Sequence, residues 1–262
     1  MKQQRLEELA AELYQAKQQR QTVAPISERE PDFTVEDAYQ VSLAFLQHRL
    51  NAGEKVIGKK IGLTSKVVQD MLGVHQPDFG FLTDNMIYRS GDSIKFSKEL
   101  IQAKSEGEIA FILKADLVGP GVTPADVLQA TESVAACFEI VDSRIRDWQI
   151  KIQDTVADNA SCGIFVLSDE RVAPQQVDFE NCKMVIKNNG EVIAQGQGSA
   201  ALGSPLNCVA WLANALGDYG VSLKAGDIIL SGSLAAMIPC KADDQMTMEI
   251  TGIGSASYQF VE

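Results

Sequence analysis

The chain has 262 residues, of which 45% are hydrophobic and 22% are charged, and its formal net charge is -12. These proportions are those of an ordinary globular protein, and the length allows one large domain or one domain with a smaller appendage. The negative charge is spread along the chain without a cluster of Lys and Arg, which argues against nucleic-acid or anionic-membrane partners.

The five cysteines are odd in number and widely spaced. They predict reduced core thiols, not a disulfide framework or a zinc site. The N-terminal residues run directly into an amphipathic polar segment, and no window approaches eighteen uninterrupted apolar residues. We therefore expect a cytoplasmic protein without a signal peptide or a membrane segment.

The first ninety residues are predicted to form a mostly helical section. Apolar residues recur with helical spacing in the first twenty residues, at Leu6, Leu9, Ala10 and Leu13. Another helix is expected after Thr34, a good N-cap with Asp37 at position N3. A third helix, opened by Thr64 or Ser65, would pack through Val67, Val68, Met71 and Leu72.

Two adjacent lysines, Lys59 and Lys60, lie in a short strand expected at residues 56–62. Side chains alternate between the faces of a strand, so both lysines cannot lie on the solvent side of a regular strand. One of them is a candidate for a buried ammonium, which needs an acid or a bound anion beside it. An irregular, exposed stretch is the alternative that these residues leave open. The loop that follows contains Pro77-Asp78-Phe79-Gly80, which is typical of a turn.

Two acids, Glu106 and Glu108, stand at the start of an apolar strand that runs to Leu113. Because side chains repeat every two residues in a strand, the two acids point to the same face. Solvated acids on an exposed strand are the more common explanation of such a pair, unless a third acid joins it. A helix capped by Thr123 is expected to run through Val134.

Glu139 is the single acid in a buried strand predicted at residues 135–141. An unpaired buried carboxylate is costly, so Glu139 is the third acid that the pair requires. Mg²⁺ and Mn²⁺ prefer oxygen ligands, and two or three carboxylates can be the complete protein contribution to such a site. The three glutamates therefore favour a hard-cation site.

The remainder of the chain is strand-rich, with a hairpin signal at Asn189-Gly190 and a helix opened by Ser204 and Pro205. Polar groups occupy nearly every position of residues 154–163, and this stretch fits a capped turn or a pocket wall. Strands and helices do not alternate regularly. We therefore expect an α+β fold, with a helical section over residues 1–90 and a β-rich catalytic domain with a large curved or rolled sheet over residues 91–262.

Six segments, in their order and spacing, resemble the 2-keto-4-pentenoate hydratase family of the fumarylacetoacetate hydrolase superfamily. They are residues 60–64, 76–80, 106–108, Glu139, 143–148 and 154–163. The resemblance covers nearly the whole chain. It implies a mixed β-sandwich roll of the fumarylacetoacetate hydrolase C-terminal type, a divalent metal that is Mg²⁺ or Mn²⁺, and a homo-oligomer.

The resemblance also implies residue roles. Glu106, Glu108 and Glu139 would hold the metal, and a partly buried Lys60 paired with Asp78 would transfer protons. Asn159 and Ser161 would orient substrate or water by hydrogen bonds. The chain departs from the family pattern at Gly203-Ser204-Pro205-Leu206, where Gly-His-Pro-Leu is frequent, and at Ala103-Lys104-Ser105, where a Pro-Arg-Ile type segment is frequent. Both departures concern the pocket wall and not a proposed ligand.

The implied reaction is the hydration of 2-hydroxypenta-2,4-dienoate to 4-hydroxy-2-oxopentanoate in the meta-cleavage degradation of aromatic compounds. Other reactions of metal-bound 2-oxo acids on the same scaffold are alternatives: decarboxylation of 4-oxalocrotonate, hydration of a longer 2-oxo acid, or hydrolysis of an acylpyruvate. A further alternative is a catalytically silent subunit. Association with a decarboxylase of the same pathway is also expected.

Overall fold

The structure is a computed structural model that describes residues 1–65, 69–70 and 73–262. The packing residues of the helix expected after Ser65, which are Val67, Val68, Met71 and Leu72, lie outside these described residues. The described helices are α1 (Gln3–Gln19), α2 (Ile26–Arg29), α3 (Val35–Asn51), α5 (Phe96–Glu99), α6 (Pro124–Ala130), α7 (Ile152–Ala157) and α8 (Pro205–Gly217). Short 3-10 turns include η1 (Arg146–Trp148) and η2 (Asn159–Ser161).

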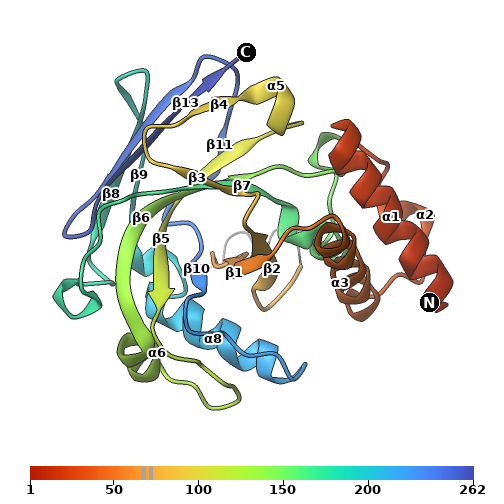
Figure 1. The fold of residues 1–262 in the computed structure, drawn as a ribbon, viewed down its shortest axis with the longest axis horizontal. Helices are drawn as coiled ribbons and strands as arrows, with labels where there is room; N and C mark the ends of the chain where they lie inside the picture. The colour runs from red at the N-terminus through yellow and green to blue at the C-terminus, as the bar shows by residue number, and fades with distance from the viewer. Residues whose placement is uncertain (66–68, 71–72) are drawn as a thin grey trace.

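Two sheets form the body of the molecule (Figure 1). The larger has the order β2-β1-β10-β5-β6-β7-β3, with β11 paired to β5. Its strands are β1 (Val56–Gly62), β2 (Asp78–Thr83), β3 (Ile87–Arg89), β5 (Lys104–Leu113), β6 (Thr131–Val141), β7 (Cys162–Leu167), β10 (Ile228–Leu230) and β11 (Ile238–Pro239). The smaller sheet has the order β4-β13-β12-β8-β9. Its strands are β4 (Ser93–Lys95), β8 (Lys183–Asn188), β9 (Glu191–Gln197), β12 (Gln245–Ile250) and β13 (Gly254–Val261).

The two sheets pack face to face, as Gly107 in β5 shows most directly. A Cβ atom built on Gly107 would lie 2.4 Å from Met184 Sδ and 2.7 Å from Met248 Sδ, and both methionines belong to the smaller sheet. Only glycine allows this approach without displacing those side chains. The observed mixed sheets and separate helices confirm the predicted α+β sandwich.

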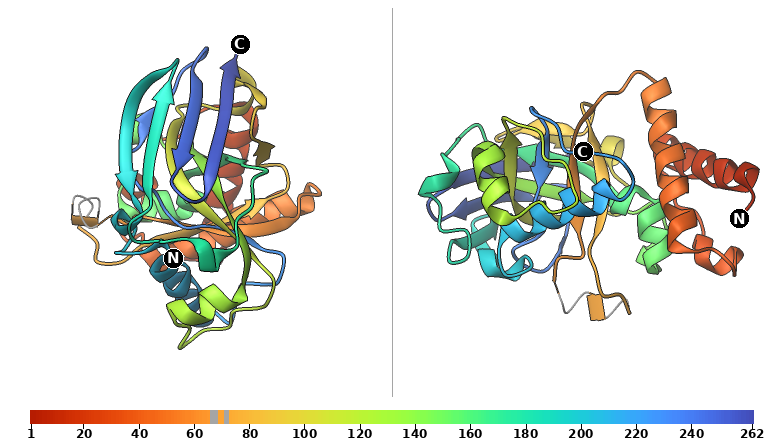
Figure 2. Two further views of the ribbon diagram at one scale, coloured as in Figure 1. Left: turned by 90° about the vertical axis from the view of Figure 1, so that its left-hand side faces the viewer. Right: turned by 90° about the horizontal axis from the view of Figure 1, so that it is seen from below.

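The N-terminal helices form a group at one end of the molecule, beside α7 (Figures 1 and 2). Their predicted signals are confirmed: Leu6, Leu9, Ala10 and Leu13 are buried, and Thr34 with Asp37 forms a capping box at the start of α3. The core formed by these helices includes Val156 and Ala157 of α7. The N-terminal helices therefore pack against α7, the helix that begins the polar stretch at residues 154–163.

The strands extend further toward the N-terminus than the predicted division at residue 90. The N-terminal helical group ends with α3 at Asn51, and β1, β2 and β3 are integral strands of the large sheet. The Pro77-Asp78-Phe79-Gly80 stretch is also not simply a turn, because β2 begins at Asp78 and pairs with β1.

The helix opened by Thr123 ends at Ala130, so the prediction that it continues to Val134 is wrong. Residues from Thr131 onward pair with β5 over its whole length. This long-range pairing takes precedence over local helical propensity. The Asn189-Gly190 hairpin is confirmed, with φ values of 51° and 87° that match a type I′ turn between β8 and β9. Among the described helices, none has the length and apolar character needed to cross a membrane.

Candidate active site and metal centre

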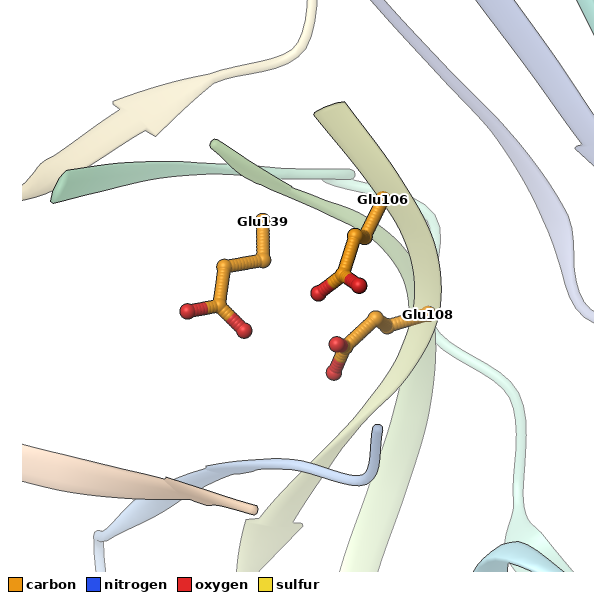
Figure 3. A group of neighbouring side chains, drawn as sticks. All are labelled: Glu106, Glu108 and Glu139. Atoms are coloured by element: carbon orange, nitrogen blue, oxygen red, sulfur yellow. The ribbon is translucent and has the colours of Figure 1, made fainter. Parts of the chain in front are cut away.

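Three glutamates converge on one face of the large sheet (Figure 3). Glu106 on β5 lies directly opposite Glu139 on β6 in the antiparallel register. Glu108 follows two residues along β5 and therefore points to the same face. One carboxylate oxygen of each residue lies within 4.8 Å of one from each of the others. The sheet register thus brings together the acids that the sequence singled out.

The environment of these acids favours a cation. Glu108 Oε2 accepts a hydrogen bond from the Gly232 N–H at 2.8 Å. Glu108 Oε1 and both carboxylate oxygens of Glu139 are buried and have no hydrogen-bond partner among the described residues. Burial, together with the charge of Glu139, raises the pKa of Glu106 to about 7 and raises the pKa of Glu108 well above its ordinary value. Neighbouring buried carboxylates with free oxygens are a poor structural arrangement unless positive charge joins them.

Lys60 supplies part of that positive charge. Its Nζ lies 3.2 Å from Glu139 Oε1 and donates a hydrogen bond to the Ala160 carbonyl at 3.1 Å. The Glu139 contact is an ion pair without hydrogen-bond geometry, which is why Glu139 Oε1 also has no hydrogen-bond partner. Burial lowers the pKa of Lys60, but the charges of Glu139 and Asp78 outweigh burial and raise it overall.

The neighbouring lysine is buried as well. Lys59 Nζ lies 2.6 Å from Asp227 Oδ2, on the opposite face of β1 from Lys60. The interpretation of an irregular, exposed stretch is therefore wrong, because both lysines are interior and each has its own acid. The direct partner of Lys60 is Glu139, whereas the sequence predicted Asp78.

Asp78 lies close to Lys60 across the β1–β2 pairing, where it is opposite Gly62. A Cβ atom on Gly62 would lie 2.2 Å from Asp78 Oδ1 and 3.1 Å from Lys60 Nζ, so the two groups share the space that this glycine leaves. Asp78 Oδ1 is buried and has no hydrogen-bond partner among the described residues. Burial raises the pKa of Asp78 to about 6, although the Lys60 charge opposes this shift.

Residues 154–163 comprise most of α7, a left-handed turn and the start of β7. Asn159, Ala160 and Ser161 have φ values of 55°, 50° and 53°, a conformation that is strained for Ala and Ser. The turn is held by Asn159, whose amide oxygen accepts from the Phe81 N–H and whose amide nitrogen donates to the Phe81 carbonyl. It directs the Ala160 carbonyl at Lys60. The polar stretch therefore acts as a wall of the site.

A cavity of about 580 Å³ opens beside the glutamates. Of the predicted site residues, Lys60, Asp78, Glu106 and Ser161 line it. Ser161 Oγ lies 3.2 Å from Thr155 Oγ1, which also lines the cavity. Asn159 does not line it, because its side chain is bound to the backbone of β2. In the structure Asn159 therefore positions the turn at residues 159–161 and, contrary to the prediction, its side chain does not face the cavity.

Several further residues of the cavity wall are not among the predicted catalytic, substrate-binding or metal-binding residues. They include Lys104, Val141, Trp148, Thr155, Ser233, Met237 and Pro239. The period of two along β5 would have placed Lys104 on the face of Glu106. No local signal places Pro239 there, because it reaches the site through the distant pairing of β11 with β5.

The donor set fits a divalent metal ion. Three carboxylates and the Lys60 ammonium leave two negative charges uncompensated when all four groups are ionised. All three acids offer hard oxygen ligands, and free carboxylate oxygens are already directed into the same space. The arrangement can hold a cation next to the buried Asp78 carboxyl and the buried Lys60 ammonium. These groups together can transfer protons to and from an oxygen-rich substrate.

The chain as a whole is similar to several known proteins. A model of the family described as Fumarylacetoacetate (FAA) hydrolase C-terminal matches residues 38–261. The 2-hydroxypent-2,4-dienoate hydratase of Pseudomonas putida is 64% identical over 83% of this chain and 98% of its own length. The 2-hydroxyhexa-2,4-dienoate hydratase of Comamonas testosteroni is 57% identical over 95% of each chain. The solved 4-oxalocrotonate decarboxylase from Pseudomonas putida G7, complexed with magnesium and adipate, has a TM-score of 0.97 and 34% identity over 100% of this chain and 99% of that chain.

Proposed function

The chain belongs to the fumarylacetoacetate hydrolase family, and from that membership we propose that it is a metal-dependent hydratase of 2-hydroxypenta-2,4-dienoate. The product is 4-hydroxy-2-oxopentanoate. The observation that carries the proposal is the placement of Lys60 and Asp78 beside the three-glutamate centre, in one cavity. The names of the close relatives support a hydro-lyase with this class of substrate.

Glu106, Glu108 and Glu139 would hold the metal, which we propose to be Mg²⁺ or Mn²⁺. When bound, this cation supplies positive charge beside the 1-carboxylate and the 2-oxygen of the substrate and stabilises negative charge on the 2-oxygen. The carboxylate oxygens that lack hydrogen-bond partners support this assignment.

Asp78 and Lys60 perform the first proton transfers in the proposed reaction. The ionised Asp78 takes the proton of the 2-hydroxyl group, and the Lys60 ammonium donates a proton to C5, which gives the 2-oxo-3-enoate. Protonation of Asp78 removes one of the negative charges that raise the pKa of Lys60, so the ammonium becomes a better donor as the reaction begins.

Hydration restores both residues. The conjugated ketone makes C4 electrophilic, and water adds there while neutral Lys60 accepts a proton from it. Protonated Asp78 then delivers its proton to C3. One water is consumed, and both side chains return to their starting states. Ser161 and Thr155, which lie 3.2 Å apart on the cavity wall, would orient the water by hydrogen bonds.

Decarboxylation of 4-oxalocrotonate is the second candidate. The TM-score of 0.97 with a decarboxylase favours it, whereas the higher sequence identity to two hydratases favours hydration. The test treats the purified protein with a chelator and then restores Mg²⁺ or Mn²⁺. A hydratase consumes the ultraviolet absorbance of 2-hydroxypentadienoate without releasing CO₂, and a decarboxylase releases CO₂ from 4-oxalocrotonate. Absence of turnover with and without metal would support a silent subunit.

Three wider expectations stay predictions. They are assembly into a homo-oligomer, association with a decarboxylase of the same pathway, and a cytoplasmic location. Size-exclusion chromatography with light scattering, alone and with the decarboxylase, tests the first two.

A further inference from the structure

We propose that Arg144 is a positioning residue for the reaction, which holds the Ala160 carbonyl against the Lys60 ammonium by closing the turn at residues 159–161. Arg144 is not among the described residues that line the cavity beside the glutamates, so it acts through this turn. The inference rests on the proposed function, because it concerns the ammonium that moves protons there.

The backbone of the turn at residues 159–161 requires support from its surroundings. Asn159, Ala160 and Ser161 have φ values of 55°, 50° and 53°, which are left-handed conformations. Residues other than glycine adopt this conformation mainly one at a time, because the Cβ atom crowds the following carbonyl oxygen. A run of three persists only where the surrounding contacts determine the backbone. Contacts of this kind hold both ends of the turn.

Arg144 binds the residues on both sides of the turn. Its Nη2 donates to the carbonyl of Asp158, which precedes the turn, and its Nη1 donates at 2.9 Å to the carbonyl of Cys162, which follows it. Nη1 also donates to the Asp142 carbonyl at 2.6 Å. The Asp158 carboxylate accepts from Arg144 Nε and, at 2.8 Å, from the Arg144 backbone N–H. One buried side chain thus fixes the distance between the two ends of the turn.

This arrangement uses the planar shape of the guanidinium. Its donors point in fixed directions in one plane, so one group reaches three carbonyl oxygens and a carboxylate at the same time. An ammonium at the same place keeps a positive charge beside Asp158 but does not reproduce this geometry. The substitution Arg144→Lys therefore separates the positioning of the turn from the pairing of a buried charge.

The turn determines where the Lys60 ammonium lies. The Ala160 carbonyl accepts from Lys60 Nζ at 3.1 Å, and Glu139 Oε1 lies 3.2 Å from the same nitrogen. If the turn relaxes, the carbonyl rotates away and the ammonium is drawn toward Glu139. A displacement of about 1 Å that originates far from the reacting atoms can lower a rate by about a hundredfold. Ser161, which lines the cavity, would move with the turn.

The substitution Arg144→Lys in the full-length, metal-loaded protein tests the proposal. We expect kcat for 2-hydroxypentadienoate to fall by about tenfold to a hundredfold. KM and the Mn²⁺ affinity should change by less than about threefold, since Arg144 is not among the described residues that line the cavity. An unchanged kcat, or a loss that appears only in KM or in metal affinity, overturns the proposal.

Arg49→Lys is the matched control. Arg49 is buried like Arg144. Its guanidinium binds the side chains of Glu54 and Thr83 and not the turn. Both substitutions weaken a buried pair of arginine and carboxylate, so both should lower the stability in urea, but Arg49→Lys should keep kcat within about twofold of the parent. Equal losses of kcat in the two variants would overturn the proposal, because general destabilisation would then explain both.

The substitution Ala160→Gly tests whether the effect passes through the turn. Glycine adopts the left-handed conformation without steric cost, so the turn depends less on the contacts at its ends. The kcat loss caused by Arg144→Lys should therefore shrink to about threefold or less when both proteins carry Ala160→Gly. A loss of the same size with and without Ala160→Gly contradicts the proposed route from Arg144 to Lys60.

Crystal structures test the geometry without turnover. In Arg144→Lys the Ala160 carbonyl should turn away from Lys60, and an unchanged turn overturns the proposal. If Arg144→Lys does not fold, Ser143→Ala replaces it, because Ser143 Oγ donates to the Asp158 carboxylate at 3.3 Å. We expect this variant to lose about threefold in kcat, the size of one hydrogen bond, and an unchanged kcat with an unchanged turn overturns the proposal.

Failure of the proposed function has a different appearance. The parent protein itself would then turn over no 2-hydroxydienoate, whereas failure of the positioning role appears only in the comparison of variants with an active parent. The crystal structures decide whether Arg144 holds the turn in either case.

Discussion

Lys60 and Glu139 form a buried ion pair, with 3.2 Å between Nζ and Oε1. Glu139 is also one of the three acids that would hold the metal. With a metal bound, the carboxylate would interact with two positive partners at once. Metal binding and the acidity of Lys60 would therefore be coupled, because positive charge on Glu139 weakens the attraction that holds the proton on the ammonium.

Substitution Lys60→Met tests this coupling. It removes a positive charge beside a metal ligand and replaces it with an apolar chain of similar length. We expect turnover to fall by about a hundredfold or more, as for the loss of a general acid or base. Mn²⁺ should bind about as tightly as in the parent or more tightly, since less positive charge competes for Glu139. Calorimetric titration with Mn²⁺ measures this, and a large loss of affinity would mean that Lys60 chiefly maintains the geometry of the site.

The neighbouring lysine provides the matched control. Lys59→Met leaves Asp227 buried without its partner on the opposite face of β1. We expect a loss of unfolding free energy on the order of 3 kcal/mol, the size found when one member of a buried pair is removed. Mn²⁺ affinity should stay unchanged in Lys59→Met. Urea unfolding and the same titration separate the two lysines.

The metal assignment is tested by Glu108→Gln. Glutamine keeps an oxygen that accepts from the Gly232 N–H, so the variant removes the charge while it retains this hydrogen bond. Mn²⁺ affinity should fall by at least about tenfold, because even changes outside the ligand shell reach that size. The metal-free variant should unfold at a higher temperature than the parent, since burial disfavours the Glu108 charge. Glu132→Gln, on an exposed position of the adjacent strand β6, is the control and should alter neither property.

The parts of this site that the sequence predicts are those with a local signature. Glu106 and Glu108 share a face because strand side chains repeat every two residues, and Glu139 stands out as an acid in an apolar run. The caps at Thr34 and Thr123 are likewise local, because each involves residues three apart. Such local patterns can be read from the sequence without knowing which distant segments become neighbours in the fold.

The missed features depend on contacts between distant segments. The ion pair of Lys60 with Glu139 arises from the large sheet, where β10 and β5 separate β1 from β6. Trp148 reaches Lys104 through the loop after β6, and Asn159 is bound to the backbone of Phe81. Periodicity describes which residues share a face, but it does not describe which strands become neighbours. The resemblance predicts Asn159 at the substrate, whereas the structure binds its side chain to the backbone of β2.

The pH dependence follows from Asp78, whose pKa burial raises to about 6. If Asp78 acts in its ionised form, kcat/KM should decline as the pH falls through about 6. Stability changes in the opposite direction: a carboxyl group whose pKa is raised in the folded state stabilises at low pH, and that contribution is lost as the pH rises through about 6.

Asp78→Asn should therefore abolish most turnover and yet stabilise the protein at pH 8, by on the order of 2 kcal/mol. The gain should shrink as the pH is lowered toward 5. Urea unfolding at pH 5 and 8 measures it, with Asp169→Asn at an exposed position as the control. A gain that does not depend on pH would exclude the buried carboxylate as its cause.

Gly107 separates the two glutamates of β5 and faces away from them, toward the smaller sheet. A Cβ atom at this position would meet Met184 Sδ at 2.4 Å and Met248 Sδ at 2.7 Å. Gly107→Ala should therefore displace these buried side chains and cost about 1–3 kcal/mol of unfolding free energy, the usual range for overpacking. Met184→Ala alone leaves a cavity and should also destabilise. In the double variant the alanine methyl enters the space that Met184 vacates, so the combined loss should be smaller than the sum of the two. Urea unfolding of the four proteins measures this coupling. Additive losses would mean that the sheet contact does not require glycine between Glu106 and Glu108.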